Sequence, residues 1–467
     1  MKTGGRGLYG IEPKHQLVVE PISQPAELSI TILRGTDRGQ CENNENAPHF
    51  DHYIGAARTH FGASETRVLT AFLIFAGTYL VMAVGRLPGF RVDRTGAAII
   101  GAALMLAANI LSVEDAYAAI NYDTIMLLFG MMIVVANLRL SGFFALVSAW
   151  VVEHARRPLL LLSGVALVSA FFSAFFVNDT MCLVLTPLVL DITGRLRRNP
   201  VPYLLAVAMA ANVGSTATIT GNPQNMMIGS FSHIPYRTFA ATLAPIAFVA
   251  LVLTVLVIAL VYHREFRAEA WQPVEHHAIR VDRPLLWKSL AVSAGMVVFF
   301  FAGWPVPKVA VIAGALLLVT RRVKPEKVYR EIDWGLLVLF IGLFIVIAGL
   351  EKTGVASRLF AAAARYHLER TAPMSIFTAI LSNLVSNVPA VLVFKGFVPH
   401  LPDVTKGWLT LAMSSTLAGN LTVLGSVANL IVLHKARHTV EISFWEYAKA
   451  GIPVAVVTMA AGIWALR

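Results

Sequence analysis

Two stretches of this chain repeat each other, and both carry glycine, amide and hydroxyl residues inside apolar sequence. Residues 221–225 read GNPQN and residues 425–429 read GSVAN, so Gly425 and Asn429 lie 204 positions after Gly221 and Asn225. Glycine and proline disfavour a continuous helix through such a segment. Unwinding frees carbonyl oxygens for a cation and directs the N-terminus of the next half-helix at an anion or polar solute. The pattern predicts two broken helices that bind a solute and a coupling ion.

A second repeated pair lies upstream of these segments. Residues 173–178 read SAFFVN and residues 382–387 read SNLVSN, within apolar regions at 158–195 and 373–400. Basic residues flank the first region at both ends, which predicts that it enters the membrane from the cytoplasm and returns. Non-helical backbone at that depth is tolerated only where it is buried in protein or lines a cavity. We therefore predict two re-entrant hairpins with polar tips.

Composition places the chain in a lipid environment. Of its 467 residues, 57% are hydrophobic and only 14% are charged, whereas soluble proteins carry about 25% charge. The net charge of +11 comes from Lys and Arg between apolar runs, which indicates cytoplasmic loops and no nucleic-acid partner. Two cysteines exclude a disulfide framework and a Cys-x-x-Cys metal cluster. These features predict a multi-pass protein of the cell (inner) membrane whose partners are the lipid bilayer and a small solute.

The apolar stretches define the predicted architecture. Stretches near the spanning length of ~20 residues occupy 67–86, 95–112, 123–140, 201–232, 237–262, 286–304, 307–321, 333–351, 406–435 and 444–466. The basic segments 86–94, 263–288, 321–330 and 434–438 then fall on the cytoplasmic side. Each half has five crossings, an odd number, so the halves run in opposite directions.

We therefore predict an all-α polytopic membrane protein made of two inverted repeats, each with a re-entrant helical hairpin and a discontinuous transmembrane helix. The predicted parts are a polar tail (1–65), a first repeat (66–262, hairpin 158–195, broken helix 201–232), a cytoplasmic linker (263–285) and a second repeat (286–467, hairpin 373–400, broken helix 406–435).

The polar residues of these four segments are the candidate binding residues for solute and ion. They are Asn178, Asp179, Thr180, Asn212, Ser215, Thr216, Thr218, Gly221, Asn222, Asn225, Ser386, Asn387, Thr416, Asn420, Thr422, Gly425, Ser426 and Asn429. Amides and hydroxyls suit a neutral solute with several hydroxyl groups. The alternative for any single Ser or Thr is an interhelical hydrogen bond without a binding role.

Asp179 is the one acid expected near the membrane centre. Burying a carboxylate there costs several kcal/mol, so it is a candidate proton carrier. The alternative is a capping role for the hairpin tip. The second hairpin has Val388 in the corresponding place, so coupling through Asp179 would be asymmetric.

These motifs resemble a known family. Residues 178–180 (NDT) followed by 185–188 (LTPL), residues 211–225 and residues 382–389 are similar to the arsenite permease and Na+/H+ antiporter group of the ion transporter superfamily. They are closest in motif to silicon (silicic acid) efflux transporters. The resemblance implies an elevator-like or rocking carrier, a homodimer, that moves a small oxyanion or metalloid against an ion gradient. Related dicarboxylate carriers show a Ser-Asn-Thr type of tip, from which residues 178–180 depart.

The leading interpretation is a secondary active transporter that exports silicic acid or arsenite in exchange for H+ or Na+ by alternating access. Na+ would bind at the hairpin tips and broken helices, and no other cofactor is expected. The alternatives are an ion-coupled symporter for sulfate, phosphate or dicarboxylate, a Na+/H+ antiporter, or a channel. A membrane-embedded enzyme is disfavoured because the apolar segments contain no paired acids, His-x-x-x-His or activated nucleophile, and no phosphate-binding loop for ATP occurs.

Overall fold

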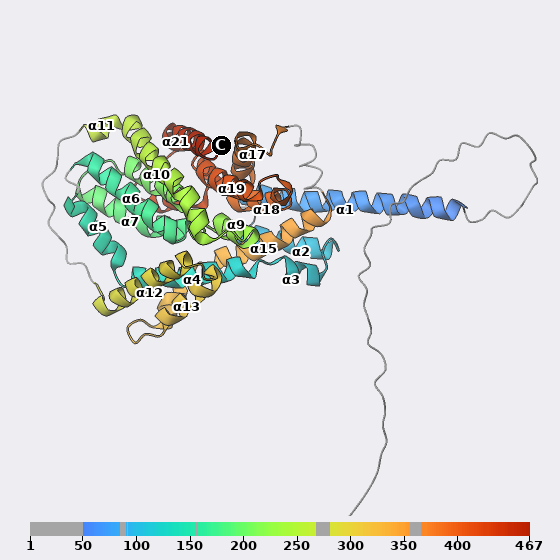
Figure 1. Ribbon diagram of the computed structural model, residues 1–467, viewed down its shortest axis with the longest axis horizontal. Helices are drawn as coiled ribbons and strands as arrows, with labels where there is room; N and C mark the ends of the chain where they lie inside the picture. Colours follow the sequence, from blue (N-terminus) through green and yellow to red (C-terminus); the bar gives the residue numbers. More distant parts are fainter. Residues whose placement is uncertain (1–49, 85–89, 91, 155–156, 268–280, 355–365) are drawn as a thin grey trace, which may run out of the picture. The chain divides into compact units, whose positions relative to one another are not determined.

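The computed structural model divides into two units, residues 1–58 and 59–467, and it describes residues 50–84, 90, 92–154, 157–267, 281–354 and 366–467. Every regular element in these ranges is helical (Figure 1). The predicted tail at 1–65 lies mostly outside the described residues. Its last part, from Phe50, belongs to helix α1 (Phe50–Val84), which therefore begins earlier than the predicted crossing.

The two halves contain similar series of helices, and α1 precedes those of the first half. The first half contains α2 (Arg94–Ala107), α3 (Val113–Ala119), α4 (Tyr122–Leu140), α5 (Phe143–His154), α6 (Pro158–Phe175), α7 (Asn178–Arg195), α8 (Pro200–Ser215), α9 (Pro223–Ser232), α10 (Tyr236–Val261) and α11 (His263–Phe266). The second contains α12 (Arg283–Phe301), α13 (Val306–Leu318), α14 (Pro325–Arg330), α15 (Trp334–Lys352), α17 (Thr371–Val385), α18 (Asn387–Lys395), η2 (Val398–His400), α19 (Val404–Ala418), η3 (Val423–Gly425), α20 (Val427–Ala436) and α21 (Phe444–Ala465). Seven helices of the described residues, α1 and six of those above, are long and apolar enough to cross a membrane.

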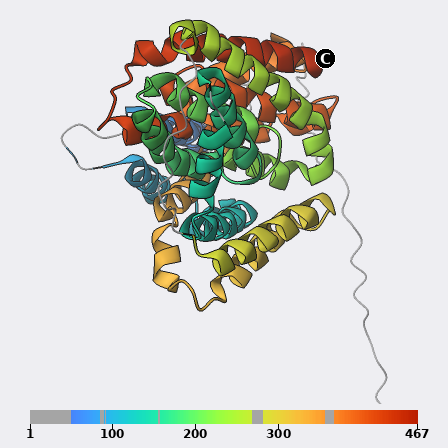
Figure 2. The same cartoon turned by 90° about the vertical axis from the view of Figure 1, so that its left-hand side faces the viewer.

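The helices of residues 92–467 form two layers (Figures 1 and 2). The flanking layer contains α2–α4 and α12–α15, in which α4 packs against α13 and α2 against α15. The central layer contains α6–α10 and α17–α21, in which α8 packs against α6, α19 against α17, and α7 against α20. The layers meet where α4 contacts α9 and where α15 contacts α18. Each layer therefore takes helices from both halves.

Close helix contacts in the flanking layer repeat between the halves. A Cβ atom on Gly130 would lie 2.6 Å from the carbonyl oxygen of Ala310, and one on Gly342 would lie 2.9 Å from Cβ of Ala98. Gly342 and Ala310 each lie 212 positions after Gly130 and Ala98. The glycine of the first half thus packs against the alanine of the second half, and the glycine of the second half packs against the alanine of the first. Such a reciprocal contact is typical of a two-fold relation between two copies of one unit. The opposite orientation of the two halves stays a prediction.

Helix ends fall inside the segments predicted to hold the hairpins and helix breaks. Two residues separate α6 from α7, one residue separates α17 from α18, and α8 and α19 end before the glycine motifs at 221–225 and 425–429. The short helix α5 between the third crossing and the first hairpin was not predicted. Its sequence is apolar but too short for a membrane span, so it was merged with the neighbouring loop.

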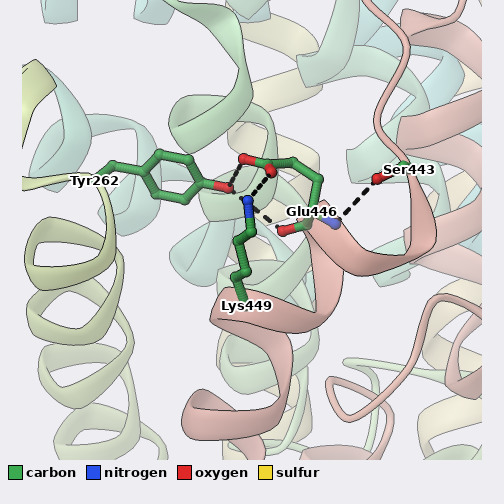
Figure 3. A network of polar contacts seen from close by, with 4 residues as sticks. All are labelled: Tyr262, Ser443, Glu446 and Lys449. Atoms are coloured by element: carbon green, nitrogen blue, oxygen red, sulfur yellow. Dashed lines mark hydrogen bonds and ion pairs between the residues drawn. The ribbon is translucent and has the colours of Figure 1, made fainter.

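The end of the first half is tied to the last helix (Figure 3). Tyr262, directly after α10, donates to Glu446 Oε1 at 2.7 Å, and Lys449 Nζ contacts Glu446 Oε2 at 2.6 Å. The backbone N–H of Glu446 donates to Ser443 Oγ at 3.1 Å, which caps the start of α21. This network joins α10 to α21, which also pack along their lengths.

Candidate functional site

The two helix breaks are closed by capping side chains. Asn222 accepts a hydrogen bond from the backbone N–H of Asn225 at 2.8 Å, and Pro223 occupies the first turn of α9. Ser426 accepts from the N–H of Ala428 at 3.2 Å at the start of α20. Asn and Ser are favoured caps because their oxygens satisfy free N–H groups, and proline is favoured in the first turn because it lacks one.

Two asparagines stabilise the unwound segments in the same way. Asn225 Nδ2 donates to the carbonyls of Ser215 and Thr218, both at 3.0 Å. Asn429 Nδ2 donates to the carbonyls of Gly419 at 2.8 Å and of Thr422 at 3.1 Å. These two residues lie 204 positions after Ser215 and Thr218. The freed carbonyls expected to coordinate a cation thus accept amide hydrogen bonds here. The duplicated asparagines replace the helical hydrogen bonds that the breaks remove.

Asn212 joins the first half to the second. Its Nδ2 donates to Asn420 Oδ1 at 2.9 Å and to Asn429 Oδ1 at 3.1 Å. Its Oδ1 accepts from Asn178 Nδ2 at 3.0 Å and from Ser426 Oγ at 3.0 Å. Asn212 is 1% exposed. One buried amide therefore connects a hairpin tip of the first half with the broken helix of the second half.

A second bridge runs between the broken helices through Thr416. Its hydroxyl oxygen accepts from Asn222 Nδ2 and from Gln224 Nε2, both at 3.3 Å. Asn222 Nδ2 also donates to Ser215 Oγ at 2.9 Å. Thr216 donates to the carbonyl of Asn212 at 3.3 Å. These contacts place four further predicted residues in one buried polar cluster.

The hairpin tips dock on the glycines of the repeated motif. The backbone N–H of Asn178 donates to the Gly221 carbonyl at 3.0 Å. The Asn387 amide satisfies both its polar atoms when its nitrogen faces the carbonyls of Gly425 at 2.9 Å and Ser415 at 3.1 Å, with its oxygen facing Gln224 Nε2 at 3.3 Å. A Cβ on Gly221 would lie 2.2 Å from the Ser215 carbonyl oxygen, so this close approach requires glycine.

The second hairpin tip is strained. Ser386 has φ +78° and ψ 161°, a region that residues other than glycine rarely occupy and that costs about 1–3 kcal/mol. It separates α17 from α18 and lines the cavity described next. Strain of this kind persists only where surrounding contacts impose it, and those contacts include the hydrogen bonds of the adjacent Asn387.

A cavity of about 90 Å³ lies between the hairpin tips and the flanking layer. Five predicted site residues line it: Asn178, Asp179, Ser386, Asn387 and Ser426. The predicted residues that do not line it are Thr180, Asn212, Ser215, Thr216, Thr218, Gly221, Asn222, Asn225, Thr416, Asn420, Thr422, Gly425 and Asn429. Most of these lie in the hydrogen-bonded cluster that supports the tips. Thr180 is half-buried outside the lining, and Thr218 donates instead to the carbonyl of Ala174 on the first hairpin.

Four cavity residues with polar side-chain atoms were absent from the predicted set: Tyr79, Arg94, Gln224 and Asn383. Gln224 and Asn383 have alanine at the corresponding positions of the other half, Ala428 and Ala174. A search for polar residues that recur in both halves therefore passes over them. Arg94 was counted only among the basic residues of a cytoplasmic loop, whereas the structure places it in the cavity wall.

The charges of the cavity come from different elements. Asp179 is the second residue of α7 and Arg94 the first of α2; both line the cavity and interact electrostatically with each other. Asp333, the N-cap of α15, also acts on Asp179. Among the described residues, neither Asp179 nor Arg94 forms a hydrogen bond or an ion pair through its side chain. The cavity therefore presents one free carboxyl and one free guanidinium.

The described residues contain no cluster of three His, Cys, Asp or Glu side chains that could hold a metal ion. Among the predicted site residues, the buried amide oxygens Asn178 Oδ1 and Asn225 Oδ1 accept no hydrogen bond from the described part of the chain. Asn178 lines the cavity, so its oxygen is available to a solute hydroxyl or to Na+. Cys182 is fully buried and lies outside the cavity lining, as is common for a cysteine that only packs against apolar neighbours.

Comparison with known proteins agrees with this geometry. The silicon efflux transporter LSI3 of Oryza sativa subsp. japonica is 29% identical, over 86% of this chain and 98% of its own length. The transporter arsB of Dictyostelium discoideum is 25% identical, over 80% of this chain and 87% of its own. The crystal structure of the Alcanivorax borkumensis YdaH transporter, which has an unusual topology, superposes with a TM-score of 0.53 at 15% identity, covering 86% of this chain and 97% of that one.

These findings confirm the predicted resemblance to transporters of the ion transporter superfamily. They also confirm the prediction of a helical, multi-pass membrane protein that is not an enzyme. The family described as citrate transporter (CitMHS) matches residues 71–418. The chain belongs to this citrate transporter family of membrane transport proteins.

Proposed function

We propose that this membrane transporter is a secondary active carrier that exports a small metalloid oxyacid, silicic acid or arsenite, in exchange for H+ or Na+ by alternating access. The homodimer that the sequence resemblance implies is part of this proposal. The observation that carries it is the cavity between the two hairpin tips, lined by Asn178, Asn387 and Ser426 and backed by amides from both halves.

The chemistry of the lining suits a neutral hydroxylated solute. Amide groups both donate and accept hydrogen bonds, so they match solute hydroxyls, which do the same. A volume of about 90 Å³ holds several waters or one small solute. The relatives include a silicon efflux transporter of Oryza sativa and a transporter named arsB.

Alternating access is supported by the way the layers are built. Asn178 and Asn387 belong to the central layer, whereas Arg94 and Leu336 face them from the flanking layer. A solute bound between the layers would change its access when one layer moves relative to the other. Asp179 lies at this boundary and is the candidate carrier of the coupling proton, with Na+ as the alternative coupling ion.

A second candidate function is ion-coupled symport of an anion. Two observations favour it: the guanidinium of Arg94 faces the cavity, and the family is described as citrate transporter. The negative charges of Asp179 and Asp333 would repel a multiply charged anion bound near Asp179. We therefore retain the oxyacid as the leading substrate class.

The test is solute flux in proteoliposomes, with silicic acid and arsenite offered separately under an imposed pH gradient and then a Na+ gradient. Counterflow driven by either gradient is expected, and it identifies the coupling ion. Asn178→Ala and Asn387→Ala should abolish this flux, while Asn137→Ala, a buried asparagine of α4 outside the cavity, should retain it. Absence of flux with both oxyacids, together with uptake of sulfate, phosphate or citrate, would refute the proposal in favour of the symporter.

A further inference from the structure

The position of Arg94 is not explained by a role as one more basic residue of a cytoplasmic loop. It begins α2 directly after the N-cap Asp93, is half-buried, and lines the cavity together with Asp179 of the first hairpin tip. The two charged groups lie beyond direct ion-pair contact, since no ion pair between them is formed. Both side chains line the same cavity, so a solute bound there can contact the guanidinium and the carboxyl together.

The cost of placing a cation here points to a ligand. A positive charge at a helix N-terminus is disfavoured by the helix dipole, and a partly desolvated guanidinium is costly unless its donors are satisfied. Arg283 has the same local setting, as the first residue of α12 after the N-cap Asp282, but it is exposed and water screens it. Within the described residues, the Arg94 side chain has no hydrogen-bond acceptor.

We propose that Arg94 is a solute-binding residue, whose guanidinium donates hydrogen bonds to oxygens of a small polyhydroxylated oxyacid while Asp179 accepts from the hydroxyl groups of the same solute. This inference rests on the proposed function and names the substrate contact that selects the solute class. The guanidinium presents several donors in a planar fork, which suits two oxygens on one central atom.

The neighbouring charges set the selectivity. Asp179 lines the cavity and Asp333 lies at the N-terminus of α15 close enough to act on it. One cation and one acid in the cavity wall suit a neutral solute better than a multiply charged anion. Arg94 thus provides directional donors for the solute without giving the cavity a net positive charge.

The experiment compares wild-type carrier with Arg94→Gln, Arg94→Lys and the matched control Arg283→Gln in proteoliposomes. Initial rates of gradient-driven silicic acid and arsenite flux are measured against solute concentration, and folding is checked by gel filtration and thermal unfolding. Loss of a charge-assisted hydrogen bond should raise KM about 10- to 100-fold in Arg94→Gln. Arg94→Lys should give an intermediate KM because it keeps the charge and loses the fork. Arg283→Gln should keep the wild-type KM.

The outcomes separate this inference from the function on which it rests. Wild-type oxyacid flux with an unchanged KM in a folded Arg94→Gln carrier overturns the inference and leaves the proposed function standing. Equal KM increases in Arg94→Gln and Arg283→Gln also overturn it, because the effect would then belong to charge at the membrane surface. A wild-type carrier that moves neither oxyacid overturns both. If Arg94→Gln does not fold, the same comparison is made with Arg94→Lys, where an unchanged KM for both solutes overturns the inference.

Discussion

Replacement of Asn212 by alanine is the most direct test of the buried amide cluster. The side chain makes four hydrogen bonds, two donated to Asn420 and Asn429 and two accepted from Asn178 and Ser426. Interhelical hydrogen bonds in membrane proteins contribute about 0.6 kcal/mol each, so the four bonds give about 2.4 kcal/mol. If the four partner groups form no other hydrogen bonds in the variant, the loss averages about 1 kcal/mol per bond, and the total destabilisation is about 4 kcal/mol.

A matched control removes the contribution of the cavity left by the shortened side chain. Asn137 in α4 is also fully buried, but its only hydrogen bond runs to the Ile133 carbonyl of its own helix at 2.8 Å, and its Oδ1 has no partner among the described residues. By the same reckoning Asn137→Ala loses one hydrogen bond, so Asn212→Ala should lower the free energy of unfolding by about 1.8–3 kcal/mol more than Asn137→Ala does.

The assay is equilibrium unfolding of the purified proteins in mixed detergent micelles, followed by tryptophan fluorescence and circular dichroism. A difference between the two variants of less than about 0.5 kcal/mol, well below the difference of about 1.8 kcal/mol worked out above, would refute the reasoning. The cluster would then not link the two halves energetically. Asn212→Ala should also lower flux at temperatures where it remains folded, because the hairpin tip at Asn178 loses its support.

Three further predictions follow from other parts of the molecule. Asn225→Asp should destabilise the carrier more than Asn225→Ala in the same unfolding assay, because a carboxylate faces two carbonyls to which the amide now donates. Gly342→Ala should lower the unfolding temperature by several degrees, since the new Cβ would lie 2.8 Å from the backbone carbon of Ala98; a normal unfolding temperature would argue against the close packing of α15 on α2. The hydrogen bond from Lys352 holds the pKa of Asp115 below its usual value, so the pair stabilises the protein above the unfolded pKa of about 4 and this stabilisation is lost as pH falls through the lowered pKa. Asp115→Asn should therefore unfold at a slightly lower temperature than wild type at pH 7 and at the same temperature in acid, and a difference that grows in acid would contradict the assignment.

Local signals explain why the element order was largely predictable. The length of an apolar stretch reports a membrane span, and Gly, Pro and Asn inside such a stretch report a break, because both effects act within a few residues of chain. The helix ends near Asn178 and Asn387 and the gaps before Pro223 and Val427 fall within the segments predicted on that basis, and the re-entrant path of the hairpins stays a prediction. The helix α5 was missed because its twelve residues fall below the spanning length.

The sequence predicted the kinds of side chain in the candidate site, but it predicted only part of which residues lie together there. Residues that recur in both halves, such as Asn225 and Asn429, were identified because duplication marks them. Arg94 and Gln224 have no such mark, and their place in the cavity depends on how α2 and α9 pack against the hairpin tips. Their functional roles remain for the flux measurements to test.

The sequence by itself determined the class of protein, the duplicated unit and the location of its polar interruptions, since each follows from residues that are neighbours along the chain. Tertiary structure alone decided which of those residues meet. Asn212 reaches Asn429 across 217 positions, and Arg94 faces Asp179 from another layer. Contacts of this kind arise from helix packing, which leaves no periodicity or spacing in the sequence.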